Sequence, residues 1–309
     1  MTGVQRCEVP AMARSEGTLD LPAPSPLRGG EADTRRVTRI RPPALSLAGL
    51  GAGVATLWAY RDLVRTLTAH RVKVRYKQSL LGVAWAILQP LSLMAIYTVV
   101  FSLFARIPSD GIPYAVFAYT ALLPWTFFST ALTNATAGLT SNTQLVTKVW
   151  FPREILPLSY VLAALFDFAI ASSVLAGLLA WYHVPVTPAV RWAVPLLAVL
   201  VVFVMGLALL LSALQVRFRD VGVAMPLLLQ LWMFASPVIY PVSAVPAHLR
   251  GVYMLNPMAG IIDGFRRAVL EGTAPDGHSL RIALAGSLLM LVVGYAFFKQ
   301  RESTLADEI

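Results

Sequence analysis

Long apolar runs separated by short charged gaps dominate the chain from Gln78 to Phe298. Five stretches contain no charged side chain, at residues 78–105, 111–147, 192–216, 221–247 and 282–298. A helix needs about 20 apolar residues to cross the bilayer core. Because lipid offers backbone amides no hydrogen-bond partner, a spanning run must be helical. The pattern therefore predicts an all-α integral membrane protein.

We expect six transmembrane helices within residues 79–299. Their approximate bounds are 80–105, 114–139, 155–182, 192–214, 221–240 and 282–298. Pro90 predicts a kink in the first of them. Lys and Arg are about twice as frequent in the loops on the side of the chain ends as on the opposite side, which predicts that both termini are cytoplasmic. Residues 300–309 would then form a cytoplasmic tail.

A basic amphipathic helix that lies on the membrane surface is expected at residues 57–78. Its apolar positions recur at helical spacing, at Leu57, Tyr60, Val64 and Leu67. Residues 71–77 alternate with a period of two, which is typical of a strand, but a lone strand has nothing to pair with, so we expect helix there too. Residues 1–56 have the composition of a disordered tail and linker, and the uncharged stretch 42–60 is an alternative first span.

Residues 243–272 are expected to form a short re-entrant or interfacial helical region before the last span. Its apolar part, Gly251–Ile262, has 12 residues and is too short to cross the membrane. Asn256 and Pro257 suit the N-cap and the first residue of a helix, and Gly272 suits its end. The apolar residues that would share one face of this helix are Met258, Ile261, Ile262, Phe265 and Val269.

Composition supports a membrane protein and excludes several kinds of chemistry. Hydrophobic residues make up 57% of the chain and charged residues 13%, whereas soluble domains carry roughly 25% charged residues. The net charge of +9 is explained by basic residues that flank the spans, so no nucleic-acid partner is expected. No Gly-x-x-x-x-Gly-Lys-Ser/Thr motif for ATP occurs. Cys7 is the only cysteine and the histidines are scattered, so no metal site is expected.

Three segments, taken in order, carry a resemblance to a known family. They are residues 74–82 (VRYKQSLLG), 148–158 (KVWFPREILPL), and 255–258 with 264–266 (LNPM and GFR). Over residues 58–299 the chain resembles the ABC-2 type transporter permeases that export polysaccharides such as O-antigen, capsule and teichoic acid. The motifs do not separate one polysaccharide from another.

The resemblance implies a transport subunit of the bacterial inner membrane rather than an enzyme. It implies a homodimer bound to two copies of a separate ABC ATPase subunit, which would bind ATP and Mg, while this chain holds no cofactor. The implied substrate is a glycan on a polyprenyl diphosphate lipid. This glycan would enter from the cytoplasmic leaflet and pass through a channel between the two permeases, with membrane lipids as further partners.

The polar segment 140–154 corresponds in this family to the coupling helix, which sits in a groove of the ATPase. The expected contact residues are Leu145, Lys148, Val149, Trp150, Phe151, Pro152, Arg153 and Glu154. Leu145, Val149 and Trp150 give an apolar face on a short element in water, where aromatic anchors need a partner to cover them. Phe151 before Pro152 would end the helix. The alternative is a loop whose aromatic side chains dip into the lipid headgroups.

The last turns of the amphipathic helix carry a basic cluster. Its members are Arg71, Lys73, Arg75, Tyr76 and Lys77. Lys and Arg bind phosphate groups well, so the diphosphate of the lipid carrier is one candidate ligand. Anionic lipid headgroups attract the same side chains, at about 1 kcal/mol each, and both ligands stay open.

Candidates for the channel lining come from the first and fifth spans, as the resemblance implies. They are Trp85, Gln89, Tyr97, Phe101, Gln230 and Trp232. Aromatic faces stack on sugar rings, and the amides would add hydrogen bonds. The alternative is ordinary packing, because most membrane aromatics lie in the core or in the interfacial belt.

Asp167 is the only acid well inside a predicted span. A charge there costs roughly 2.5–3.5 kcal/mol at the helix centre, so the side chain should face protein or water. We expect a structural hydrogen bond to a neighbouring helix, and proton coupling is the alternative.

Other functions compete with polysaccharide export. The first is an ABC-2 permease for a drug or a lipid, against which the amphipathic helix and the Asn256-Pro257 region favour polysaccharide. A glycan-processing membrane enzyme or scaffold would need acidic or histidine clusters at a membrane face, and the sequence has none. A secondary transporter would need inverted repeats and buried charge.

Overall fold

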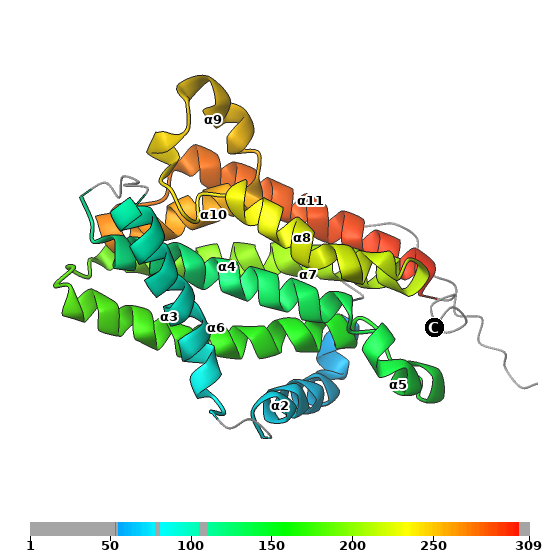
Figure 1. Cartoon of the computed structure of the whole chain (residues 1–309). Helices are drawn as coiled ribbons and strands as arrows, with labels where there is room; N and C mark the ends of the chain where they lie inside the picture. The colour runs from blue at the N-terminus through cyan, green and yellow to red at the C-terminus, as the bar shows by residue number, and fades with distance from the viewer. Residues whose placement is uncertain (1–52, 54, 78–80, 105–110, 303–309) are drawn as a thin grey trace, which may run out of the picture. The chain divides into compact units, whose positions relative to one another are not determined.

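The computed structural model describes residues 53, 55–77, 81–104 and 111–302, and every element in these ranges is helical (Figure 1). All of them belong to the compact unit that runs from Pro42 to Ile309. The all-α membrane class is confirmed. The predicted disordered tail lies, up to residue 52, outside the described residues, as does the end of the chain from residue 303.

Five helices in the described ranges are long and apolar enough to cross a membrane. They are α3 (Ala84–Tyr97) with its π-helical continuation η1 (Thr98–Phe104), α4 (Tyr114–Thr136), α6 (Ile155–Trp181), α7 (Ala193–Arg217) after the 3-10 turn η3 (Pro188–Trp192), and α11 (Gly277–Arg301). The fifth predicted span corresponds to α8 (Asp220–Phe234), which has 15 residues. Its length of about 22 Å at 1.5 Å per residue is less than the bilayer core. The count of six spans therefore stays a prediction.

Helix α4 is the centre of the bundle, since most of its residues are buried. It packs against α3, α6, α7, α8 and α10, and its largest fully buried side chains are Tyr119 and Phe128. Helices α7 and α11 form another close pair, in which a Cβ atom on Gly294 would lie 2.0 Å from the carbonyl oxygen of Gly206. Small residues of this kind let two membrane helices approach closely.

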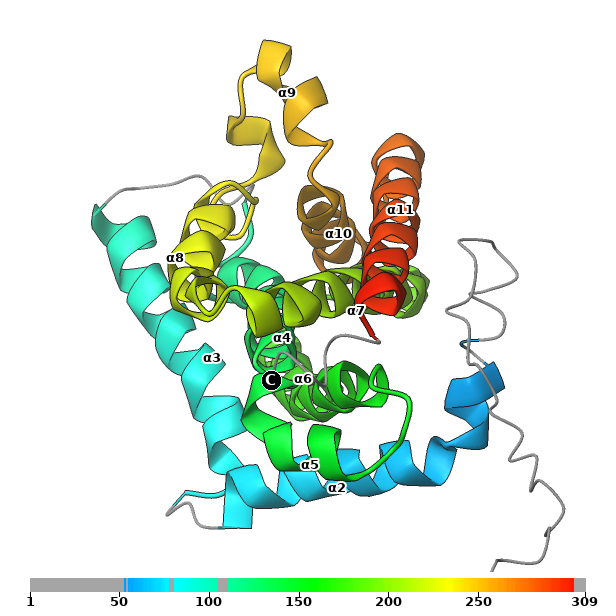
Figure 2. The ribbon, with the colours of Figure 1, turned by 90° about the vertical axis from the view of Figure 1, so that its right-hand side faces the viewer.

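Helix α2 (Arg61–Lys77) lies crosswise to the spans and packs against α6 (Figure 2). Its Val64 is buried in a second apolar cluster with Leu139, Val146 and Phe151. The helix predicted through residues 71–77 is confirmed, despite their period-two pattern. Arg71 and Arg75 are four residues apart and both contact α6, whereas Lys73 and Lys77 are exposed on another face of the helix. Two helical faces that each carry basic residues thus give the apparent period of two. Its location at a membrane surface stays a prediction.

The segment between α4 and α6 contains the 3-10 turn η2 (Thr140–Asn142) and the short helix α5 (Thr143–Lys148). Figure 1 shows α5 at the end of the spans where α11 finishes. Helix α5 ends at Lys148, and Val149 has an extended backbone. The prediction that Phe151 and Pro152 end this helix is therefore wrong by three residues, because Val149 already leaves the helical conformation.

The region before the last span contains η4 (Val242–Ala244), α9 (Ala247–Tyr253), α10 (Pro257–Arg266) and its π-helical continuation η5 (Arg267–Glu271). The Asn256 side chain accepts a hydrogen bond from the backbone N–H of Met258 at 3.1 Å, and Gly272 ends the helix with φ of +68°. The predicted cap, first residue and stop are confirmed. The predicted apolar face is fully buried, because α10 packs against α4, α7 and α11.

Candidate functional site

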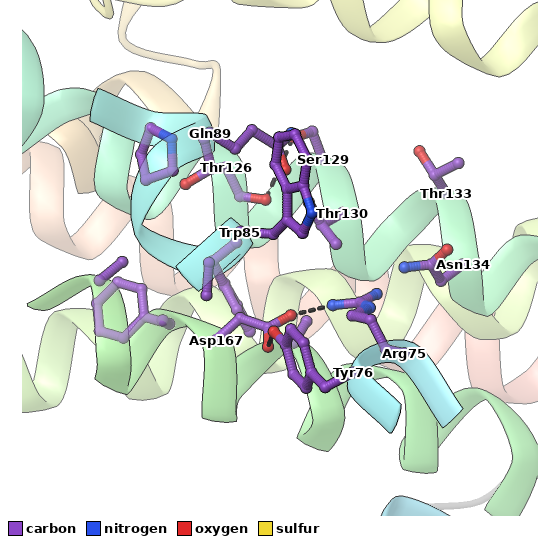
Figure 3. Close-up of a pocket in the computed structure, with 16 residues that line it drawn as sticks. Arg75, Tyr76, Trp85, Gln89, Thr126, Ser129, Thr130, Thr133, Asn134 and Asp167 are labelled. Atoms are coloured by element: carbon purple, nitrogen blue, oxygen red, sulfur yellow. Dashed lines mark hydrogen bonds and ion pairs between the residues drawn. The ribbon is translucent and has the colours of Figure 1, made fainter. Parts of the chain in front are cut away.

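A polar pocket of about 550 Å³ lies among α2, α3, α4 and α6 (Figure 3). It brings together residues that the sequence assigned to three separate roles. These are Arg75 and Tyr76 of the basic cluster, Trp85 and Gln89 of the channel candidates, and the acid Asp167. They are distant in sequence and meet because the end of α2 reaches the middle of α6 while α3 starts beside both.

Asp167 is held by two side chains of α2. Arg75 pairs with one carboxylate oxygen and the Tyr76 hydroxyl donates to the other, as the dashed lines in Figure 3 mark. The hydrogen bond expected for Asp167 therefore exists, and its partner is the amphipathic helix rather than another span. Burial, together with the hydrogen bond to Asp167, raises the pKa of Tyr76 to about 12, so its hydroxyl remains a proton donor at neutral pH.

Arg71 makes a second attachment of α2 to α6. Its Nε donates to the Ser159 hydroxyl at 2.7 Å, and its guanidinium lies 3.4 Å from the centre of the Tyr160 ring. Arg71 and Arg75 thus bind this protein's own α6. The other basic residues of the cluster, Lys73 and Lys77, are exposed and have no ion-pair partner among the described residues. Among the residues predicted to bind phosphate or lipid headgroups, these two lysines have exposed side chains that pair with nothing in the described ranges.

A polar stripe on α4 forms the opposite wall of the pocket, and sequence reasoning missed it. Its members are Thr126, Ser129, Thr130, Thr133 and Asn134. Residues three and four apart share one face of a helix. The spacing of these residues could therefore have predicted a polar face on an otherwise apolar span. The hydroxyls of Thr126 and Ser129 donate to carbonyls of their own helix at 2.8 and 3.3 Å.

The predicted coupling segment divides into exposed and buried parts. Val149 is exposed, Trp150 is 73% exposed and Leu145 is half-buried. Phe151 is instead buried in the second apolar cluster with Val64 of α2, and Pro152 is buried beside it. The expectation that Phe151 faces the ATPase thus does not fit its position, because its ring packs in the second apolar cluster while the ring of Trp150 stays exposed.

Two further residues of this segment form an ionic cluster with the end of α11. Glu154 is 1% exposed and accepts a hydrogen bond from Lys299 Nζ at 2.7 Å, and Lys299 also contacts Glu302 at 2.8 Å. Arg153 binds the carbonyl of Glu302 with its side chain. Burial raises the pKa of Glu154, and the bond from Lys299 opposes that shift. The segment is therefore anchored to α11.

The other four channel candidates do not reach this pocket. Tyr97 and Phe101 stack edge to face and pack against α4. Trp232 packs edge to face on Phe128 and donates to the Asn256 side chain at 3.1 Å. Gln230 is exposed on α8. Three of these four candidates thus contribute to packing inside one protomer.

Arg266 at the end of α10 is buried. Its guanidinium donates to the carbonyls of Val238 and Tyr240 at 2.7 and 3.0 Å and lies 3.6 Å from the centre of the Phe117 ring. This arginine fixes the loop after α8 onto α4 and α10.

The fold and the site together define a multi-pass helical membrane protein with a polar pocket among its helices. Residues 62–270 match the ABC-2 type transporter family, and the chain belongs to this family. It is 32% identical over 259 residues to the O-antigen export system permease protein RfbA of Myxococcus xanthus, which covers 83% of this chain and 98% of that protein.

Two other relatives extend the comparison. A protein of the same name from Klebsiella pneumoniae is 30% identical over 247 residues, covering 80% of this chain and 94% of its own. The polysialic acid transport protein KpsM of Escherichia coli is 24% identical over 248 residues, covering 78% and 94%. Both matches cover nearly the whole length of these relatives.

Proposed function

We propose that this chain is the membrane-spanning permease subunit of an ATP-driven exporter that moves a polyprenyl-diphosphate-linked polysaccharide across the bacterial inner membrane. The observation that carries the substrate class is the similarity to an O-antigen export permease over 98% of that protein's length. The polysialic acid transport protein supports the same class from a second kind of polysaccharide. The glycan would resemble O-antigen, capsule or teichoic acid.

A separate ABC ATPase, in two copies, supplies the energy in this proposal and holds ATP and Mg. The chain has no P-loop motif of its own. Trp150 and Val149 present exposed apolar side chains on a short segment outside the spans. Aromatic anchors of this kind are frequent energetic centres of protein interfaces. We assign them to the contact with the ATPase, with Arg153 and Glu154 holding the segment from behind.

A homodimer with the passage between its two copies is the second part of the proposal. Helices α3 and α8 expose apolar side chains such as Ile96 and Leu231, which a partner or lipid must cover. Gln89 and Gln230 are exposed on the same helices, and polar side chains in a membrane favour helix contacts or water. In this arrangement α8 and the turn after it form the fifth of six spans, and both termini are cytoplasmic.

The function is tested by deleting the gene in its own host. We expect the surface polysaccharide to disappear and the lipid-linked glycan to accumulate inside, measured by immunoblot of the cell surface and by mass spectrometry of extracted lipids. Normal surface polysaccharide without accumulation would overturn the assignment.

The contact with the ATPase is tested in the complemented strain. Trp150→Ala should reduce export and the amount of ATPase that copurifies. Trp181→Ala is the matched control, because Trp181 is 79% exposed at the opposite end of α6, and it should leave copurification unchanged. Equal copurification with both variants would refute the contact and leave the transport function standing.

A further inference from the structure

The polar pocket contains side chains that the fold leaves without hydrogen-bond partners. The polar groups of Gln89, Thr130, Thr133 and Asn134 face it and have no partner among the described residues. Groups of this kind inside a membrane protein need water or a polar ligand, because lipid cannot satisfy them. These side chains are accessible rather than buried, so the pocket can hold water or a polar ligand that offers several hydrogen bonds.

The charges of the pocket argue for a neutral ligand. Its two charged side chains, Arg75 and Asp167, neutralise each other, and Tyr76 already donates its proton to Asp167. A diphosphate needs cations that are free to pair with it. The exposed cations of α2, Lys73 and Lys77, are not among the lining residues. The pocket and the basic cluster thus offer different chemistry.

The shape and the aromatic wall match a sugar. Trp85 is 52% exposed and lines the pocket, and its indole is drawn next to Ser129 and Thr130 of the polar stripe in Figure 3. A sugar ring has apolar C–H faces and a polar edge, so a lining that contains both an indole and hydroxyl and amide groups can satisfy both. The volume of about 550 Å³ falls within the roughly 300–1,000 Å³ of small-molecule pockets.

We propose that this pocket is a saccharide subsite, which binds one or two neutral sugar residues of the exported glycan beside the main passage. The inference rests on the proposed function. Trp85 stacks on the ring, while Gln89, Thr130 and Asn134 bind its hydroxyls. The Arg75–Asp167 pair closes the site at the α2 side and keeps it uncharged.

Photocrosslinking in the intact complex tests where the glycan lies. Thr133, which is exposed on the polar stripe, is replaced by p-benzoylphenylalanine in host cells that make the glycan. We expect a permease adduct that carries the glycan, detected with a glycan antiserum. The control position is Leu289, exposed on α11, which should give no such adduct.

The same experiment separates a glycan from a lipid headgroup. In a strain blocked in glycan synthesis, adducts at position 133 are detected instead by mass spectrometry of the purified permease, and none should form. An adduct that persists there identifies a membrane lipid as the occupant and overturns the proposal. Export without any glycan adduct at position 133 also overturns it.

Substitutions test whether the unpaired groups bind substrate. The variant Thr130→Val/Asn134→Leu removes the polar groups with little change of volume. It should raise by about tenfold the concentration of lipid-linked glycan that half-maximally stimulates ATP hydrolysis in purified complex. The control is Thr120→Val on the same helix, and it should leave this concentration unchanged. The Thr120 hydroxyl donates to the carbonyl of Val116 at 2.8 Å, and Thr120 does not line the pocket.

The outcomes keep the subsite and the transport function apart. A wild-type complex that responds to lipid-linked glycan, with an unchanged response in the double variant, removes the subsite alone. A wild-type complex that neither responds to nor crosslinks with lipid-linked glycan removes the proposed function together with the subsite.

Discussion

Two carboxylates, one just before the start of α6 and one in its middle, make the same type of ion pair in opposite surroundings. Glu154 pairs with Lys299 of α11, and Asp167 pairs with Arg75 of α2. The exposed fractions of the side chains are 1% and 14% in the first pair, and 18% and 35% in the second. The first pair is sealed, whereas the second lines the polar pocket.

The difference indicates what each pair does. A sealed pair is costly to desolvate, and it persists only with close geometry and further hydrogen bonds, so Glu154 and Lys299 are expected to lock the coupling segment to α11. An open pair remains in contact with water or ligand and tolerates substitution better. The same type of ion pair therefore joins two segments at Glu154 and Lys299, and lines the polar pocket at Asp167 and Arg75.

Breaking the sealed pair should have the largest effect. Lys299→Met leaves Glu154 buried without its cation, and removal of one partner of a buried pair typically costs about 3–5 kcal/mol. Replacing both, as Glu154→Leu/Lys299→Met, should recover most of that stability. Unfolding of the purified permease in detergent measures it. If the single variant loses less than about 1 kcal/mol of unfolding free energy, which is close to the value for an exposed pair, the sealed and the open ion pair do not differ in their contribution to stability.

The next largest difference is expected between alanine variants of the two neighbouring aromatic residues of the coupling segment. Phe151→Ala removes a ring from the second apolar cluster and should cost about 3 kcal/mol of unfolding free energy. Trp150→Ala removes an exposed ring and should stay within about 0.5 kcal/mol of the wild type. The same unfolding assay compares them. A similar loss in both variants would show that Trp150 is covered within the protomer.

The open pair should give a smaller effect. Asp167→Leu deprives Arg75 and Tyr76 of their acceptor, and loss of hydrogen bonds to a charged group, reduced by solvent at Arg75, predicts about 1–2 kcal/mol. Asp167→Asn keeps an acceptor and should retain most export. Unfolding and surface polysaccharide are measured together. Complete loss of export in a stable Asn variant would favour the alternative role of Asp167 in proton coupling.

The comparison also shows how far the sequence predicts this protein. Apolar runs predict the spans because lipid leaves the backbone no other conformation. Asn256, Pro257 and Gly272 predict the limits of α10 and its continuation because caps and stops are local. Asp167 was predicted to need a partner because the free-energy cost of a charge inside a span depends only on its position in that span.

The partners themselves were beyond the sequence. Lys299 lies 145 positions from Glu154 and Arg75 lies 92 from Asp167, so each pairing depends on how helices pack. For the same reason Glu154 and Phe151 were expected at the ATPase contact, although both turn inward. The polar stripe of α4 was readable from its spacing, but only its neighbours α2, α3 and α6 reveal that it lines a pocket.

A third carboxylate, fully outside the spans, should give the smallest effect and one that responds to acid. Asp276 caps α11 and accepts from the backbone N–H and the hydroxyl of Ser279, both at 2.8 Å. These bonds lower its pKa, the backbone bond most. Because the folded pKa lies below the unfolded one, the contribution is complete above about pH 4 and is lost as the pH falls through the folded pKa.

Asp276→Asn should therefore match the wild type near neutral pH, since Asn caps a helix about as well as Asp. Below about pH 4 the wild type should lose stability relative to this variant, so that the gap between their unfolding midpoints changes with pH. Lys299→Met is titrated alongside for comparison. Burial raises the pKa of Glu154, whereas hydrogen bonds lower the pKa of Asp276. A constant gap between the wild type and Asp276→Asn down to about pH 3 would mean that Asp276 gains nothing from its charge, and that the geometry of the cap alone holds the start of α11.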